Sequence, residues 1–209
     1  VTAGPTQEAG DPVRDITNHS TGKMGYAIAK IASRRGAEVT LVSGPTAEEE
    51  PAFVNVVNVC SAKEMFEAVK ERAQEQDIII KAAAVADYRP KHIRGSKMKK
   101  TEDGSDLTLE LERTDDILAY LGAHKKQGQF LCGFAMETED LIANAKRKLE
   151  KKRLDMIAAN SLRVEGAGFG GNTNVVTVIT KEKEVSLGKM TKEETAAELL
   201  TMIAEARKV

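Results

Sequence analysis

Short runs of β-branched and aliphatic residues alternate along the chain with segments whose apolar residues recur at helical spacing. Residues 22–35 place Met24, Ile28 and Ile31 on one helical face and end on two arginines, which suit the negative end of a helix. Residues 37–44, which follow directly, have the composition of a strand. This alternation is typical of parallel strands that are connected by crossover helices.

The same rhythm continues to the end of the chain. Two helices are predicted to start at capping boxes, one formed by Ser61 and Glu64 and the last one by Thr191 and Glu194. Further strands are predicted at residues 53–59, 78–80, 107–112, 129–134, 155–159 and 174–180, further helices at 62–75, 115–122 and 139–152, and a glycine-rich loop at 166–171.

Two segments decide the architecture. Ile78, Ile79 and Ile80 are apolar on both faces of a strand, as in the centre of a parallel sheet. Residues 90–106 are polar, basic and rich in turn formers, and the alternating residues 107–112 after them suit a half-exposed strand outside the main sheet. We expect a single α/β domain over residues 1–209, with a doubly wound, mostly parallel, Rossmann-like sheet and a flexible arm at about 88–113. Ligands of such sheets bind at the carboxyl ends of the strands, here in the loops after Ala3, Val42, Ala84 and Phe134.

The charge balance excludes several classes of protein. With 31 Lys and Arg against 32 Asp and Glu, the net charge of -1 argues against a polycationic nucleic-acid binder and against an acidic tail. No apolar run approaches the roughly 18 residues that cross a bilayer, so we expect a soluble cytoplasmic protein without nucleic-acid or membrane partners.

The cysteines and the first residues of the chain carry two smaller expectations. Cys60 and Cys132 suit neither a disulfide framework nor a zinc site, and we expect both to be small buried residues in a reducing cytoplasm. The chain opens on Val1 in what looks like the end of a strand, so we expect a fragment of a longer polypeptide.

The start of the first helix is a candidate anion site. Gly4 ends the first predicted strand, and Ser20 and Gly22 lie where backbone amides and the helix dipole favour a phosphate, although simple helix capping is the alternative. The segment is not a Walker A loop, because Lys23 precedes Met24 rather than Ser or Thr. It is also a poor dinucleotide fingerprint, because the GxGxxG motif is incomplete and Ser43 stands where an acidic ribose ligand is expected.

Other catalytic patterns are not supported. Tyr26 and Lys30 have the Tyr-x-x-x-Lys spacing of short-chain dehydrogenases but follow the first strand directly, so core packing explains Tyr26 better. The three histidines lie in separate segments without metal-ligand spacing, and no GxSxG motif exists.

Clustered lysines favour a nucleoside triphosphate over a dinucleotide. Lys148 and Lys152 lie four residues apart on one predicted helix face, and Lys97 belongs to a lysine-rich stretch of the arm. Solvated surfaces are the alternative for both groups. Asp87 follows the small residues 82–84 at the mouth of the central strand, where a carboxylate can meet a ribose hydroxyl or a cation.

Four motifs in the same order connect the chain to a known family. At residues 18–25 (NHSTGKMG), 82–90 (AAAVADYRP), 96–100 (SKMKK) and 133–138 (GFAMET) it closely resembles phosphopantothenoylcysteine synthetases, the second enzymatic half of bacterial bifunctional coenzyme A biosynthesis proteins. The resemblance implies a ligase that uses CTP to join 4'-phosphopantothenate to L-cysteine through an acyl-cytidylate, releasing pyrophosphate and then CMP. The opening AGPT resembles the bacterial, CTP-using form.

The resemblance also implies roles for individual residues. Asn18 would hold the activated acyl group by donating its amide to the carbonyl oxygen, and Lys97 would neutralise triphosphate charge. The chain has Asp115 where the family often has a proline, and this difference weakens the match of that turn. The implied nucleotide contacts are Lys81, Ala82, Ala83, Asp87, Lys97, Asp115, Asp116, Ile117, Leu118, Phe134, Lys148 and Lys152.

Cofactors and partners follow from the same resemblance. Mg2+ would be held mainly through the nucleotide phosphates, and the arms of two copies would pack in a homodimer. A decarboxylase half is expected in the parent chain, and no flavin is expected to bind this part. The rival function is a non-catalytic nucleotide-binding regulator on the same fold. An NAD(P) oxidoreductase is disfavoured by Ser43.

Overall fold

The centre of the molecule is an eight-stranded sheet. The structure is a computed structural model that describes residues 1–100, 106–137, 139–161 and 170–207. Six neighbouring strands are parallel, and β12 and β13 extend the sheet in antiparallel fashion at one edge. In sheet order the strands are β13 (Glu184–Ser186), β12 (Thr177–Ile179), β10 (Met156–Ser161), β9 (Phe130–Glu137), β6 (Ile78–Lys81), β1 (Thr2–Ala3), β4 (Val39–Ser43) and β5 (Val54–Asn58).

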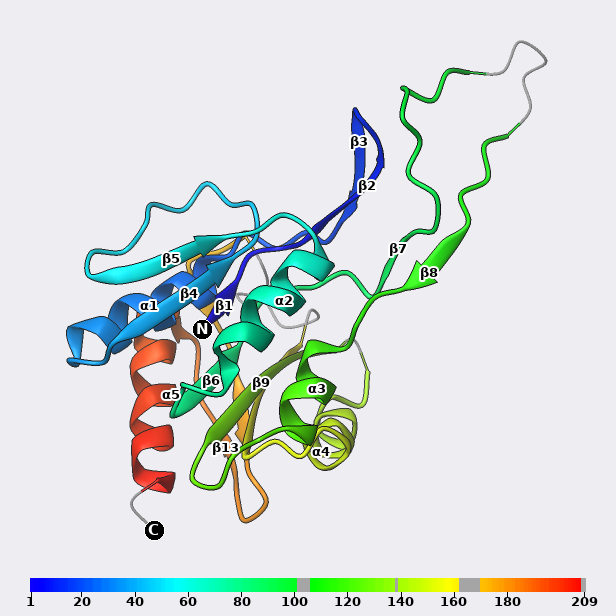
Figure 1. The fold of residues 1–209 in the computed structure, drawn as a ribbon. Helices are drawn as coiled ribbons and strands as arrows, with labels where there is room; N and C mark the ends of the chain where they lie inside the picture. Colours follow the sequence, from blue (N-terminus) through cyan, green and yellow to red (C-terminus); the bar gives the residue numbers. More distant parts are fainter. Residues whose placement is uncertain (101–105, 138, 162–169, 208–209) are drawn as a thin grey trace.

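Helices cover both faces of this sheet (Figure 1). One face packs against α1 (Lys23–Arg34) and α5 (Lys192–Ala206), and the other against α2 (Ala62–Ala73), α3 (Ile117–Ala123) and α4 (Leu141–Lys151). Ile79 points into the core on the α2 side, and its neighbour Ile80 points into the core on the α1 side, because successive side chains of a strand alternate. The expected doubly wound, mostly parallel α/β fold is confirmed.

The two predicted capping boxes differ in outcome. Thr191 accepts a hydrogen bond from the Glu194 amide at 3.1 Å, and the Glu194 carboxylate accepts one from the Thr191 amide at 2.7 Å. At α2, Ser61 caps the Glu64 amide at 3.2 Å, but the Glu64 carboxylate accepts from the amide of Cys60, one residue before the capping box position. Both helices begin where the sequence predicts.

Two small ladders lie outside the main sheet and rise side by side from it (Figure 1). The hairpin of β2 (Gln7–Asp11) and β3 (Arg14–Thr17) follows β1 and precedes α1 along the chain. It was not predicted from the sequence. The arm is joined to the body by the ladder of β7 (Tyr88–Pro90) and β8 (Leu111–Arg113). A third ladder, of β11 (Thr173–Asn174) and β14 (Met190–Thr191), lies beside the start of α5.

Three sequence predictions need correction or fall outside the description. The strand predicted at 107–112 was wrong for residues 107–110, which run irregularly with Leu107 and Leu109 exposed to solvent, because alternation alone does not supply a partner strand. Cys60 was predicted to be buried, but it is exposed in the loop between β5 and α2, whereas Cys132 is buried in β9. Of the glycine-rich loop at 166–171, only the last two residues are described.

The length and hydropathy of the helices bear on membrane insertion. Within the described ranges, no helix combines the length and the apolar character that crossing a bilayer requires.

Candidate functional site

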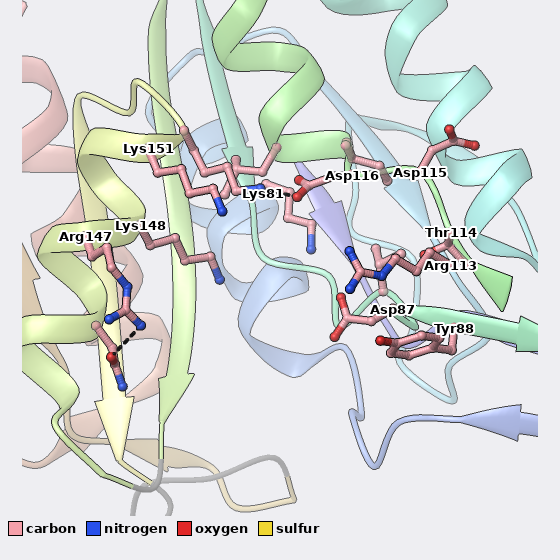
Figure 2. Close-up of a pocket in the computed structure, with 15 residues that line it drawn as sticks. Lys81, Asp87, Tyr88, Arg113, Thr114, Asp115, Asp116, Arg147, Lys148 and Lys151 are labelled. Atoms are coloured by element: carbon pink, nitrogen blue, oxygen red, sulfur yellow. Dashed lines mark hydrogen bonds and ion pairs between the residues drawn. The ribbon is translucent and has the colours of Figure 1, made fainter. Parts of the chain in front are cut away.

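A cavity of about 650 Å³ opens at the carboxyl end of β6, between the start of α3 and one face of α4 (Figure 2). Its cationic side chains outnumber its carboxylates, so the local field favours a polyanion. The cations are Lys81, Arg113, Arg147, Lys148, Lys151 and Lys152, and the carboxylates are Asp87, Asp115 and Asp116.

Lys81 is the cation that ends β6, and it is half-buried in this cavity. Its Nζ atom donates a hydrogen bond to the carbonyl oxygen of Ala83 at 2.8 Å. Burial, and then the charge of Lys148, lower the pKa of Lys81 to about 8. The ammonium group therefore lacks a counter-charge strong enough to offset its desolvation, and a bound phosphate would supply one.

Three further contacts stabilise the wall of the cavity. Asp116 caps α3 by accepting a bond from the Ala119 amide at 2.8 Å, and its other carboxylate oxygen pairs with Lys152. Partial burial acts to raise the pKa of Asp116, but the bonds from Lys152 and Ala119 outweigh it and the net pKa is lowered. Lys148 donates to the carbonyl oxygen of Phe134 at 3.2 Å.

A second cavity of about 280 Å³ adjoins the first. Lys81, Val85, Asp87 and Lys148 line both, so the two cavities form one cleft with two compartments. The second compartment is also lined by the start of α1, from Ser20 to Gly25, and by residues of β9 and of the loop after β6. First-turn amides of a helix have no intrahelical acceptor, which makes this compartment suited to an anion.

Gly22 and Gly4 shape the second compartment differently. Gly22 caps α1 in the left-handed region at φ 80°, lines the compartment, and donates its amide to Ser20 Oγ at 3.3 Å. Gly4, at φ +78°, lines neither compartment, and a Cβ atom there would lie 2.9 Å from the Gly44 carbonyl oxygen. Gly4 thus allows its backbone to approach that of Gly44 closely, whereas Gly22 and Ser20 line the second compartment.

Asn18 lies beside the cleft rather than in its lining. Its Nδ2 atom donates to the carbonyl oxygens of Ala84 at 3.0 Å and Val85 at 3.2 Å. Both amide hydrogens are therefore engaged by the loop after β6, and the remaining polar atom of the side chain is the acceptor Oδ1. The donor role toward an acyl carbonyl oxygen that the resemblance implied is thus not available to Asn18 in this arrangement.

The cleft brings together most of the residues that sequence reasoning selected. The first compartment contains Lys81, Asp87, Asp115, Asp116, Ile117, Leu118, Lys148 and Lys152, and the second adds Ser20, Gly22, Ala82, Ala83 and Phe134. Lys97 is exposed on the arm and lines neither compartment.

Sequence reasoning missed Arg113, Arg147, Lys151 and Tyr88, which also line the first compartment (Figure 2). Arg147 and Lys151 carried a usable signal, because they repeat the four-residue spacing of Lys148 and Lys152 one position earlier. Arg113 and Tyr88 enter the cavity from the base of the arm, which no local pattern indicates.

The chain is similar to known proteins over nearly its whole length. The coenzyme A biosynthesis bifunctional protein CoaBC of Vibrio vulnificus (strain YJ016) is 48% identical over 203 residues, which cover 97% of this chain and 51% of that protein. The chain thus spans about half the length of this curated relative.

Two solved structures share the fold. The crystal structure of the C-terminal domain of CoaBC is 46% identical, with a TM-score of 0.82 over 97% of this chain and 91% of that chain. A mutant of Cab2 in complex with phosphopantothenate-cysteine is 18% identical, with a TM-score of 0.77 over 99% of this chain and 85% of that chain, and this likeness shows the fold alone.

The family description "DNA/pantothenate metabolism flavoprotein C-terminal domain" matches residues 1–206. The chain therefore belongs to this family, which confirms the resemblance to the synthetase half of CoaBC that the four motifs indicated.

Proposed function

We propose that this chain is a ligase of coenzyme A biosynthesis that joins 4'-phosphopantothenate to L-cysteine with CTP as the activating nucleotide. The observation that carries the proposal is the two-compartment cleft, whose cation-rich part adjoins the amide-rich start of α1. CTP would occupy the first compartment and reach Ala82, Ala83 and Phe134 of the second, where phosphopantothenate would bind at the start of α1. Lys81 and Lys148, which line both, would lie at the reacting phosphate.

The reaction would proceed in two steps. The carboxylate of phosphopantothenate attacks the α-phosphorus of CTP, the bond to the β-phosphate oxygen breaks, and pyrophosphate leaves. The cysteine amine then attacks the acyl carbon, loses its proton, and displaces CMP as the amide forms. Lys81 and Lys148 would offset charge in the first step, where fixed cations stabilise the transferring phosphate.

The donor set fits a Mg2+ ion that is bound mainly by nucleotide phosphates. Within the described ranges, no three His, Cys, Asp or Glu side chains gather as a metal site, but Asp87 and Asp115 are exposed carboxylates of the first compartment. A phosphate-bridging Mg2+ needs only one or two such carboxylates. When bound, it would supply additional neutralisation of phosphate charge.

The arm supports a proposed homodimer. Large apolar side chains are exposed on the arm and at the hairpin tip, where a second copy would cover them: Val13, Ile93, Leu107, Leu109 and Leu111. A decarboxylase half in the parent protein is proposed by analogy with CoaBC. That relative is named a bifunctional protein, and this chain covers only 51% of its length.

The first expected result concerns the reaction itself. With phosphopantothenate and Mg2+ present, the protein should release pyrophosphate with CTP, and release should continue when cysteine is added. ATP, GTP and UTP in parallel reactions measure nucleotide preference. A protein that binds CTP but releases no pyrophosphate would support the non-catalytic regulator instead.

The second expected result separates catalysis from assembly. Lys97→Gln should slow single-turnover pyrophosphate release roughly 10- to 100-fold, because a lysine contact to phosphate charge is worth about 1.5–3 kcal/mol. Sedimentation should show the same oligomeric state as wild type. Lys99→Gln, at an exposed lysine two residues away, is the matched control and should retain the rate. Loss of the dimer with an unchanged rate would assign Lys97 to assembly.

A further inference from the structure

The tip of the β2–β3 hairpin holds a carboxylate that is buried although its ion-pair partner is not. The side chain of Asp11 is 0% exposed, whereas that of Arg14 is 48% exposed. Asp11 Oδ1 accepts hydrogen bonds from the amides of Val13 at 2.8 Å and Arg14 at 2.9 Å, as expected of a residue that closes a tight turn.

The other carboxylate oxygen makes a contact that turn closure does not require. Asp11 Oδ2 accepts from the Arg14 guanidinium at 2.7 Å and from the backbone amide of Met98 at 2.9 Å. Met98 lies far along the chain, on the arm. The bond from the Met98 amide is the main cause of a lowered pKa of Asp11, and it outweighs the opposing effect of burial.

Two more hydrogen bonds and a buried side chain fix the same part of the arm. The Arg14 guanidinium donates to the carbonyl oxygen of Met98 at 3.0 Å, so both backbone polar groups of Met98 are bound to the hairpin. The Met98 side chain is buried, at 5% exposure. The Arg94 amide donates to the carbonyl oxygen of Gly10 at 3.0 Å. The backbone of Lys97 therefore lies within a segment that is attached to the hairpin at Arg94 and at Met98.

The opposite end of the hairpin lies beside the cleft. Thr17 is the last residue of β3, and Asn18, which follows it, is bound to the loop of Ala84 and Val85. The hairpin thus extends from the cleft wall to the arm segment that carries Lys97. Figure 1 shows the hairpin rising beside the arm.

We propose that Asp11 is a positioning residue, which fixes the backbone of Lys97 relative to the cleft through its bond to the Met98 amide. The inference rests on the proposed role of Lys97 in the ligase reaction. A lysine side chain stabilises a developing phosphate charge most when its backbone is already fixed. Folding has then already ordered the backbone, so little conformational entropy is lost during the reaction. Asp11 touches no substrate and acts through Met98 and Lys97.

Asp11→Asn tests the proposal with little change of shape. The variant keeps one acceptor oxygen but loses the charge that binds Arg14 and Met98 together. The matched control is Asp15→Asn, at an exposed carboxylate of the same hairpin. Met98→Ala is a second variant, which removes the buried side chain and leaves the carboxylate intact.

The first readout is amide hydrogen exchange, which needs no nucleotide. The Met98 amide of Asp11→Asn should exchange at least 10-fold faster than in wild type, while amides of the central strand β9 keep their rates. Asp15→Asn should match wild type throughout. Unchanged exchange at Met98 would overturn the proposal. If Asp11→Asn fails to fold, the amide of residue 98 in Met98→Ala should keep the wild-type rate, because its bond to Asp11 is intact. Faster exchange there would show that the buried side chain, and not Asp11, holds the arm, and would also overturn the proposal.

The second readout is single-turnover pyrophosphate release without cysteine. Asp11→Asn should slow it at least 10-fold in the wild-type background and by less than 2-fold in the Lys97→Gln background, since its effect passes through Lys97. Equal slowing in both backgrounds would show a general structural effect and overturn the positioning role. An inactive wild type would refute the ligase proposal, whereas the exchange rates would still decide whether Asp11 holds the arm.

Discussion

Replacing Lys81 by Met should weaken CTP binding by about 100-fold and at the same time stabilise the folded protein. The loss of affinity follows from removal of a cation that lines both compartments of the cleft, a charged contact worth about 2–3 kcal/mol. The gain in stability, about 1–2 kcal/mol, follows because burial of the ammonium lowers the pKa of Lys81 to about 8, so the charged form is disfavoured in the folded state. Calorimetric CTP titration and urea denaturation measure the two effects.

The pH dependence of this stability gain has a defined sign. Below pH 8 the lysine is charged in both the folded and unfolded states, and the full desolvation penalty acts on the wild type. Between pH 8 and the unfolded pKa of about 10.4, the folded protein loses the proton first and the penalty is relieved. The stability difference between Lys81→Met and wild type should therefore shrink as pH rises through this window.

Lys63→Met is the matched control for Lys81. Lys63 is an exposed lysine of α2, away from the cleft, and its replacement should change stability by less than about 0.5 kcal/mol and leave CTP affinity unchanged. If Lys81→Met bound CTP as tightly as wild type, Lys81 would have no place in the nucleotide site. If it destabilised the fold, the bond to Ala83 would be worth more than the buried charge costs.

Replacing Asn18 by Asp should leave the first half-reaction intact and slow the second by roughly 100-fold, the loss of about 3 kcal/mol that removal of one aligned polar group produces. Asn18 uses both amide hydrogens to hold Ala84 and Val85. A carboxylate has no hydrogen to donate and would be repelled by both carbonyl oxygens, so the side chain and the acyl group beside it would shift. The acyl-cytidylate should accumulate in quenched reactions with or without cysteine.

Asn55→Asp, at an exposed position of the edge strand β5, provides the same chemical change away from the cleft. It should consume the intermediate at the wild-type rate. Normal consumption in Asn18→Asp as well would remove Asn18 from the second half-reaction, and a loss of cytidylate formation would instead place Asn18 in the first.

The parts of the fold that the sequence predicts are those whose signal is local. The capping box at Thr191 needs only Thr and Glu three residues apart, and the central strand needs only three consecutive isoleucines. The hairpin β2–β3 gives no such signal, because its strands carry polar residues on both faces. Its buried Glu8 is satisfied by a distant partner, the amide of Ala62 at 2.8 Å.

The same distinction applies to the candidate site. Lys148 and Lys152 were predictable because helical spacing places them on one face, and the cleft contains both. The partial burial of Lys81 and its contact with Ala83 depend on how the end of β6 meets the start of α3 and one face of α4, which residue spacing does not encode. The contact of Asp11 with Met98 depends on two segments that meet only in the folded chain.

The order of strands in the sheet also bears on how the molecule acquires its shape. On the β9–β13 side, partners are near in sequence, as where Met156 pairs with Cys132, whereas Thr2 in β1 must find Lys81. Loop closure costs more entropy for the distant pair, so the β9–β13 side can serve as a nucleus to which β6 and then β1 are added. Because the cleft is bounded by the end of β6 and by the start of α1, which packs on β1, ligand-binding competence should be among the last properties to emerge during folding.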